Sequence, residues 1–167
     1  MRYTDFSIKI EPPRDGVFPV NVIRSPAGED RGTMYPPFEV DALNEFLEGF
    51  AERVRATGTG GSRAESSTKS PSGPEAENLG DELFRALFGK ELLSLLDESL
   101  GGVRRERHRG LRIKLHFDLK EPALAQLASL PWEFLYRHER RLFLGLSRKT
   151  PIVRYLDLPK AAEPPHL

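Results

Sequence analysis

The chain has 167 residues, with 25 Lys or Arg against 25 Asp or Glu, so its formal net charge is zero. This length suits one ordinary domain, and the absence of cysteine excludes disulfides, thiolate metal ligands and a cysteine nucleophile from this chain. No apolar run reaches the roughly 18–20 residues that span a bilayer, and the N-terminus has no apolar secretory core. We therefore expect a cytoplasmic protein that does not contact a membrane.

The N-terminal module, residues 1–56, is expected to begin with a β-hairpin. Apolar residues alternate with polar ones over Tyr3–Ile10, and the alternation resumes over Phe18–Val22 after a turn that contains Asp-Gly. Proline cannot donate to a sheet ladder, so Pro19 predicts that the second of these strands lies at a sheet edge.

A third, shorter strand within 32–40 and a helix complete this module. The helix begins at Asp41, which can cap it, and its apolar residues follow the spacing of one helical face. That apolar stripe consists of Leu43, Phe46, Leu47, Phe50 and Val54. Residues 57–77 are mostly Gly, Ser, Thr and Pro and contain no aromatic side chain, which predicts a flexible linker or a long disordered loop.

Helical periodicity returns in the next predicted region, residues 78–158. Apolar residues draw one face over 79–88 and a second, leucine-rich face over 92–100, and Gly89 permits a break between them. Gly101-Gly102 is expected to end the second helix, because glycine favours helix C-termini.

The rest of this region predicts a sheet. Strict alternation over Leu111–Lys120 is typical of a strand with one buried and one solvated face. A short helix over 123–130 follows Pro122, and the segments after Leu130 predict three short strands, before a Pro-rich tail over 159–167. The elements together predict an α+β fold, or a three-layer α/β/α variant of it, in which the helices over 79–100 cover a mixed sheet.

No set of residues in the sequence predicts a catalytic or metal-binding site. The histidines are scattered without metal-ligand spacing, at His108, His116, His138 and His166. Ser147 lacks the surroundings of a catalytic serine, and Glu133 has no second carboxylate for acid–base work. We interpret Glu133 as a structural residue that pairs with an arginine, and we expect no catalytic residue and no cofactor.

Basic residues form the best binding feature of the sequence. They are concentrated in the second half, opposite an acidic first half, so a solvated face or an acidic protein partner is favoured over nucleic acid. The candidate partner-binding residues are Arg104, Arg105, Arg107, Arg109, Arg140 and Arg141.

Four segments, in this order and spacing, carry a resemblance to a known family: LGDELFRALF (79–88), GLRIKLHFDL (110–119), LPWEFLY (130–136) and LFLGLSRKTPIVRYLDLP (142–159). They resemble the region that precedes and leads into the CHAT domain of bacterial caspase-like, clan CD proteins. YTDFSIKI, the following hairpin and SPAGE look like the N-terminal module of the same proteins. The most specific part is the LPWE and TPIVRYL pair, with Leu130, Pro131, Trp132, Glu133 and Tyr155.

The resemblance implies a non-catalytic front portion. In that family a peptidase uses a His and a Cys that lie further toward the C-terminus than these motifs. It also implies a place in bacterial conflict or defence signalling. We therefore expect an interaction and regulatory module, not an enzyme, that docks a peptidase or other effector or assembles with itself through a sheet edge.

Two alternatives stay open at this point. The chain could be the pseudo-catalytic half of a cysteine peptidase that is active only with its missing half. It could also be a nucleic-acid-binding module that uses the basic 104–149 region, in which case its affinity would fall steeply with salt.

Overall fold

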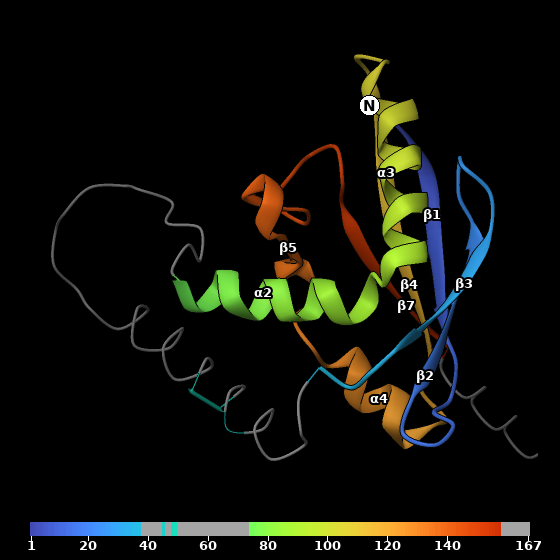
Figure 1. Ribbon diagram of the computed structural model, residues 1–167, viewed down its shortest axis with the longest axis vertical. Coiled ribbons are helices and arrows are strands. Elements are labelled where there is room, and N and C mark those ends of the chain that lie inside the picture. The colour runs from blue at the N-terminus through green and yellow to red at the C-terminus, as the bar shows by residue number, and fades with distance from the viewer. Residues whose placement is uncertain (38–44, 46–47, 50–73, 158–167) are drawn as a thin grey trace, which may run out of the picture.

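The computed structural model describes residues 1–37, 45, 48–49 and 74–157 (Figure 1). Most of the helix predicted from Asp41, most of the 57–77 linker and the 159–167 tail lie outside the described residues. The described part has an α+β fold built on a five-stranded mixed sheet with the strand order β3-β2-β1-β4-β7. A separate ribbon pairs β5 with β6.

The sheet joins strands from both ends of the chain. β1 (Arg2–Ile10), β2 (Phe18–Arg24) and β3 (Asp30–Met34) are antiparallel neighbours, as the predicted hairpin requires. β1 also pairs in parallel with β4 (Arg109–Asp118), and β4 pairs in parallel with β7 (Ile152–Asp157). Segments on either side of the predicted linker therefore share one sheet.

The prediction that the strand containing Pro19 lies at an edge is wrong, because β2 has β1 on one side and β3 on the other. The carbonyl of Pro19 accepts a hydrogen bond of 2.9 Å from the N–H of Glu11, one residue beyond the end of β1. Glu11 and Pro19 face each other just past the end of β1, so the missing N–H of Pro19 forgoes only the return bond to Glu11 at the last position of this ladder.

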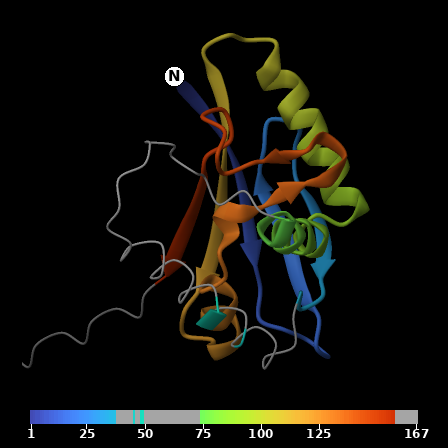
Figure 2. The ribbon, with the colours of Figure 1, turned by 90° about the vertical axis from the view of Figure 1, so that its left-hand side faces the viewer.

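Three helices cover one face of this sheet: α2 (Pro74–Leu87), α3 (Lys90–Arg104) and α4 (Pro122–Ala128). Figure 2 shows them in front of the sheet, together with the β5–β6 ribbon. No described helix lies on the other face, so the described part has two layers and not the three of the α/β/α variant.

The alternation of apolar residues places the core between these layers. Even-numbered positions of β1 and β2 and odd-numbered positions of β4 face the helices, because side chains alternate along a strand. Burying each such side chain contributes about 1.5–3 kcal/mol. The buried sheet residues are Phe6, Ile8, Ile10, Phe18, Val20, Val22, Leu111, Ile113, Leu115 and Phe117.

Both leucine-rich helices differ in length from their predictions. α2 begins at Pro74, inside the predicted linker, since a proline needs no N–H partner at the first helical position. α3 does not end at Gly101-Gly102 but continues to Arg104. Val103 is buried one turn beyond Leu100, so its burial extends the helix past the two glycines.

The segment after α4 is a compact turn where a strand was predicted. Trp132–Phe134 forms a short 3-10 helix, η1, and only then do β5 (Tyr136–Arg137) and β6 (Leu142–Phe143) pair. Gly80 of α2 lies directly against this turn: a Cβ there would be 2.1 Å from the carbonyl oxygen of Phe134. A larger residue at this position would push α2 away from the turn.

Candidate interaction site

β7 is an edge strand with an unusual composition for an edge. It pairs with β4 on one side, and in the part of the chain that the structure describes no strand pairs with its other side. Three apolar side chains on it are half-exposed: Val153 at 36%, Tyr155 at 43% and Leu156 at 46%. β-Branched and aromatic residues on an unpaired edge invite the addition of another strand.

The hydrogen bonds between β4 and β7 show which backbone groups are free. The N–H of Ile113 donates to the carbonyl of Pro151 at 2.9 Å, and that of Leu119 donates to the carbonyl of Asp157 at 3.3 Å. Backbone groups of alternate residues point to opposite sides of a strand, so the odd-numbered residues of β7 bind β4. The N–H and C=O groups of Ile152, Arg154 and Leu156 therefore point outward, along the free edge.

Arg154 fixes the edge to the rest of the fold. Its Nη2 donates to both carboxylate oxygens of Glu133, at 3.0 and 3.1 Å, and its Nη1 donates to the carbonyl of Ala128 at 2.9 Å. Glu133 thus pairs with an arginine, in the LPWE turn that follows α4. This clamp holds β7 extended before any partner arrives, which lowers the entropic cost of pairing.

The LPWE turn is itself held by burial. Trp132 and Leu130 are buried, and the Trp132 Nε1–H donates to the carbonyl of Leu127 at 2.8 Å. The indole ring also packs on Phe117 of β4, with ring centroids 6.1 Å apart. A Cβ on Gly145 would lie 2.3 Å from the carbonyl of Glu133, so only glycine lets the chain pass the turn on its way to β7.

The open face beside the edge carries aromatic and charged side chains. The Tyr155 ring stacks on His116 with centroids 4.9 Å apart, and the Lys114 Nζ lies 5.1 Å from its centre. Burial lowers the pKa of His116, and Lys114 and Lys9 lower it further against the opposing effect of Asp157. These neighbours hold the Tyr155 ring against the sheet.

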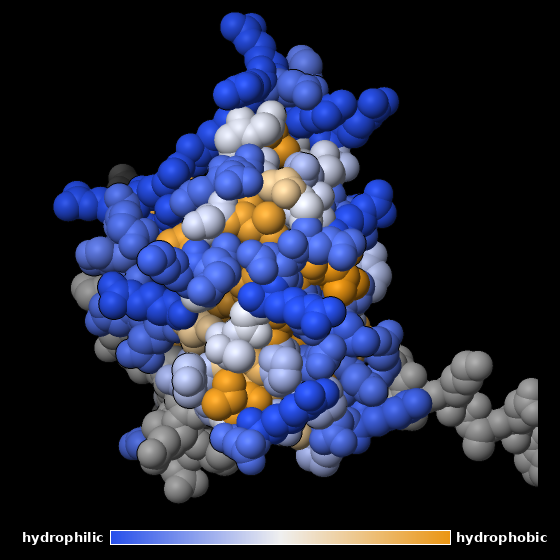
Figure 3. Space-filling view, turned by 45° about the vertical axis from the view of Figure 1, so that its right-hand side comes forward, coloured by the Kyte–Doolittle hydropathy of each residue, from blue (hydrophilic) through white to orange (hydrophobic). Residues whose placement is uncertain are grey.

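Lys114 also pairs with an acid on this face, Asp5. Its Nζ donates to Asp5 at 2.6 Å, and Arg112 Nε donates to the same carboxylate at 2.8 Å. Burial by itself would raise the pKa of Asp5, but these two hydrogen bonds outweigh it and hold the pKa below its usual value. The side of the molecule in Figure 3 is mostly hydrophilic, with smaller apolar areas between its charged side chains.

The predicted basic residues lie away from this edge. Arg104 ends α3, Arg105 and Arg107 lie in the turn that follows, and Arg109 begins β4, where it pairs with Glu106 at 2.8 Å. Exposed Arg141, with φ of 48°, follows the second 3-10 helix, η2 (His138–Arg140).

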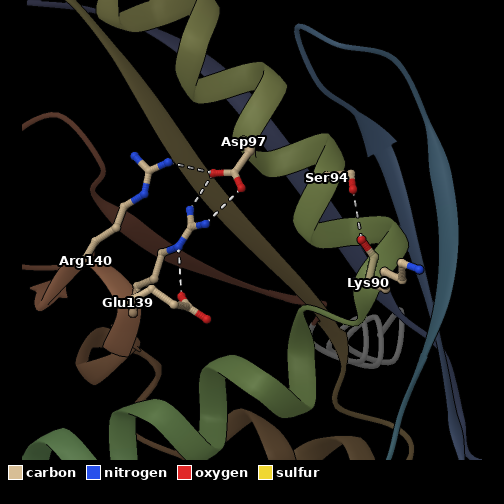
Figure 4. Close-up of polar contacts among 6 residues, drawn as sticks. Lys90, Ser94, Asp97, Glu139 and Arg140 are labelled. Carbon is tan, nitrogen blue, oxygen red and sulfur yellow. Dashed lines mark hydrogen bonds and ion pairs between the residues drawn. The ribbon is translucent and has the colours of Figure 1, made fainter.

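Arg140 is already engaged by an acid on α3. Its Nη2 lies 3.4 Å from Asp97, which also binds Arg137 through a bidentate contact (Figure 4). The hydrogen bond from Arg137 is the main reason that the pKa of Asp97 lies below its usual value. This network ties the β5–β6 ribbon to α3, so Arg140 has a structural partner.

The described histidines and acids do not form a metal site. Within residues 1–37, 45, 48–49 and 74–157, no three His, Asp or Glu side chains are grouped in a way that could hold a metal ion. His108, His116 and His138 lie in separate parts of the fold.

Sequence reasoning missed Arg154, the residue that clamps the edge to Glu133. The segments after Leu130 predicted short strands but not their place in the sheet, and Arg154 was not singled out. The signal that could have found Arg154 is its position: a charged residue in the middle of an apolar strand needs a partner when one face is covered.

No family model, curated protein or solved structure matches this chain. Among the described residues, no helix has the length and apolar character needed to cross a membrane.

Proposed function

We propose that this chain is a non-catalytic interaction and regulatory module of a CHAT-type bacterial conflict or defence system. It docks a peptidase, another effector or a second copy of itself by accepting a strand at the free edge of β7. The observation that carries the proposal is the combination of outward backbone groups and half-exposed apolar side chains on one clamped edge strand.

Strand addition supplies both affinity and selectivity at this edge. The outward N–H and C=O groups of Ile152, Arg154 and Leu156 bind any extended segment, while the side chains on the two faces select its sequence. A regulatory role follows because an effector strand bound at β7 occupies the edge and excludes every other strand.

The test is the mass of the protein in solution with and without the product of the adjacent reading frame. A complex that survives gel filtration is expected, and Leu156→Pro is expected to abolish it by removing one outward N–H. Leu156→Ala is the matched control, since it removes the same side chain but keeps the N–H. Equal binding of the partner by the wild type and by Leu156→Pro would exclude docking at β7.

A further inference from the structure

We propose that β7 pairs with β7 of a second copy of this chain, antiparallel and centred on Arg154. The inference rests on the proposed function, because it uses the same edge, and it names the partner. The resulting dimer has one continuous sheet through both copies, with the two-fold axis perpendicular to the sheet at Arg154.

The outward backbone groups favour this register over its neighbours. In an antiparallel pair, two residues that face each other across a hydrogen-bonded site exchange both of their N–H···O=C bonds. With Arg154 opposite its own copy, Ile152 lies opposite Leu156 of the second copy, and Leu156 lies opposite Ile152. All three outward residues of each copy are then satisfied, for a total of about six hydrogen bonds. If the pair were centred on Ile152, Leu156 would have no partner within β7, and if it were centred on Leu156, Ile152 would have none.

The side chains are self-complementary in the same register. Residues that face each other across two strands lie on the same face of the sheet. On the helix-covered face Ile152 meets Leu156, and on the open face Val153 meets Tyr155, so each apolar side chain meets an apolar one. Over residues 152–156, β7 therefore has the same chemistry read in either direction from Arg154. An interface between two identical copies requires this symmetry. Pairing with a strand of an unrelated protein does not require it.

The charge at the centre is compensated within each copy. Two arginines directly opposite each other would repel. Each Arg154, however, donates to both oxygens of its own Glu133 at 3.0 and 3.1 Å and also to the carbonyl of Ala128. The guanidinium is thereby neutralised and directed toward the LPWE turn, so the central pair brings two ion pairs together and not two bare charges.

The first experiment measures mass by sedimentation equilibrium across a concentration series. The wild type is expected to be a dimer and Leu156→Pro a monomer with an unchanged far-ultraviolet circular dichroism spectrum, because the lost N–H makes no bond inside one copy. Leu156→Ala is expected to dimerise roughly tenfold more weakly, since two cross-strand pairs are reduced at up to about 1 kcal/mol each.

The second experiment tests the register by cross-linking and does not depend on proline tolerance. The chain has no cysteine, so each introduced thiol is unique. Arg154→Cys is expected to oxidise to a disulfide dimer, because facing hydrogen-bonded residues have Cα atoms about 5.5 Å apart. The Val153→Cys, Tyr155→Cys double variant, which keeps the Arg154 clamp, is expected to cross-link as well. Either of these two substitutions alone places its thiol about 8 Å from its own copy and is expected not to cross-link.

The outcomes separate this inference from the proposed function. A protein that is monomeric at every concentration, a dimer that Leu156→Pro leaves intact, or efficient cross-linking of Tyr155→Cys alone would each overturn pairing about Arg154. If a monomeric wild type still binds an effector and Leu156→Pro abolishes that binding, docking at β7 stands and only the second copy is wrong. If neither a second copy nor an effector binds through β7, both proposals fail.

Discussion

The two edge strands of the sheet, β3 and β7, differ in the side chains they expose beside their unpaired backbone groups. β3 exposes Asp30, Arg31 and Thr33. β7 instead exposes Val153 and Leu156. Charged edge strands resist pairing with other chains, whereas apolar edges promote it. The contrast indicates that one edge of this sheet is protected and the other is available.

Support beneath the two edges differs as well. β3 packs directly on α3, where a Cβ on Gly32 would lie 3.2 Å from the side chain of Leu92. Beyond its pairing with β4, β7 is supported by the clamp between Arg154 and the LPWE turn, by Ile152, which packs against the core, and by Tyr155, which stacks on His116. The available edge therefore depends on a few contacts that substitution can remove one at a time.

The largest effect is expected from Trp132→Ala, which removes the buried centre of the LPWE turn. Losing a fully buried aromatic side chain costs about 3–5 kcal/mol of unfolding free energy. The Nε1–H bond to Leu127 is lost as well. Denaturant unfolding measures the loss, and hydrogen exchange is expected to rise earlier in β7 than in β3. Equal protection of the two edges would show that the turn does not support β7.

Making β7 resemble β3 is expected to weaken association at little cost in the free energy of unfolding. Val153→Lys with Leu156→Lys places charges opposite apolar residues of any added strand, so the dimer is expected to weaken more than tenfold. Thr33→Lys on β3 is the control for a new charge on the protected edge, and should leave the mass unchanged. If the β3 substitution weakened the dimer and the β7 substitutions did not, the interface would lie at β3 and not at β7.

Glu133→Gln tests the clamp alone. The pair with Arg154 is half-exposed, so its loss is expected to lower the unfolding free energy by less than about 1 kcal/mol. The same change leaves the central arginines of the dimer uncompensated, so association is expected to weaken more than stability does. The comparison of the dimer dissociation constant with the unfolding free energy measures this difference. An unchanged dissociation constant would contradict the compensation of charge at the two-fold axis.

The smallest expected effect is a pH dependence of the unfolding free energy, caused by His116 on the open face. Its pKa in the folded protein lies below the ordinary value of 6.5, so the unfolded chain binds a proton more readily. Stability is therefore complete above about pH 6.5 and falls as the pH is lowered through that value toward the folded pKa. His116→Gln is expected to remove this decline, while exposed His138→Gln keeps it. Thermal unfolding between pH 7.5 and 5.5 measures this decline in stability. A wild type that is more stable at the lower pH would contradict the prediction.

Local pattern alone determined much of the fold. The alternation in β1, β2 and β4 and the helical spacing in α2 and α3 are properties of neighbouring residues, so the sequence by itself predicted an α+β fold with these elements. The same reasoning placed α4 after Pro122, because proline fits the first helical turn.

Only the tertiary structure decided which strands are neighbours and therefore where the candidate site lies. Pro19 suggested an edge, but β3 covers β2, and β7 became the edge through its parallel pairing with β4. The clamp between Arg154 and Glu133 joins residues 21 positions apart across a turn that no periodicity describes. Periodicity reports which side of an element is buried, whereas strand order and charge partners depend on contacts between distant parts of the chain.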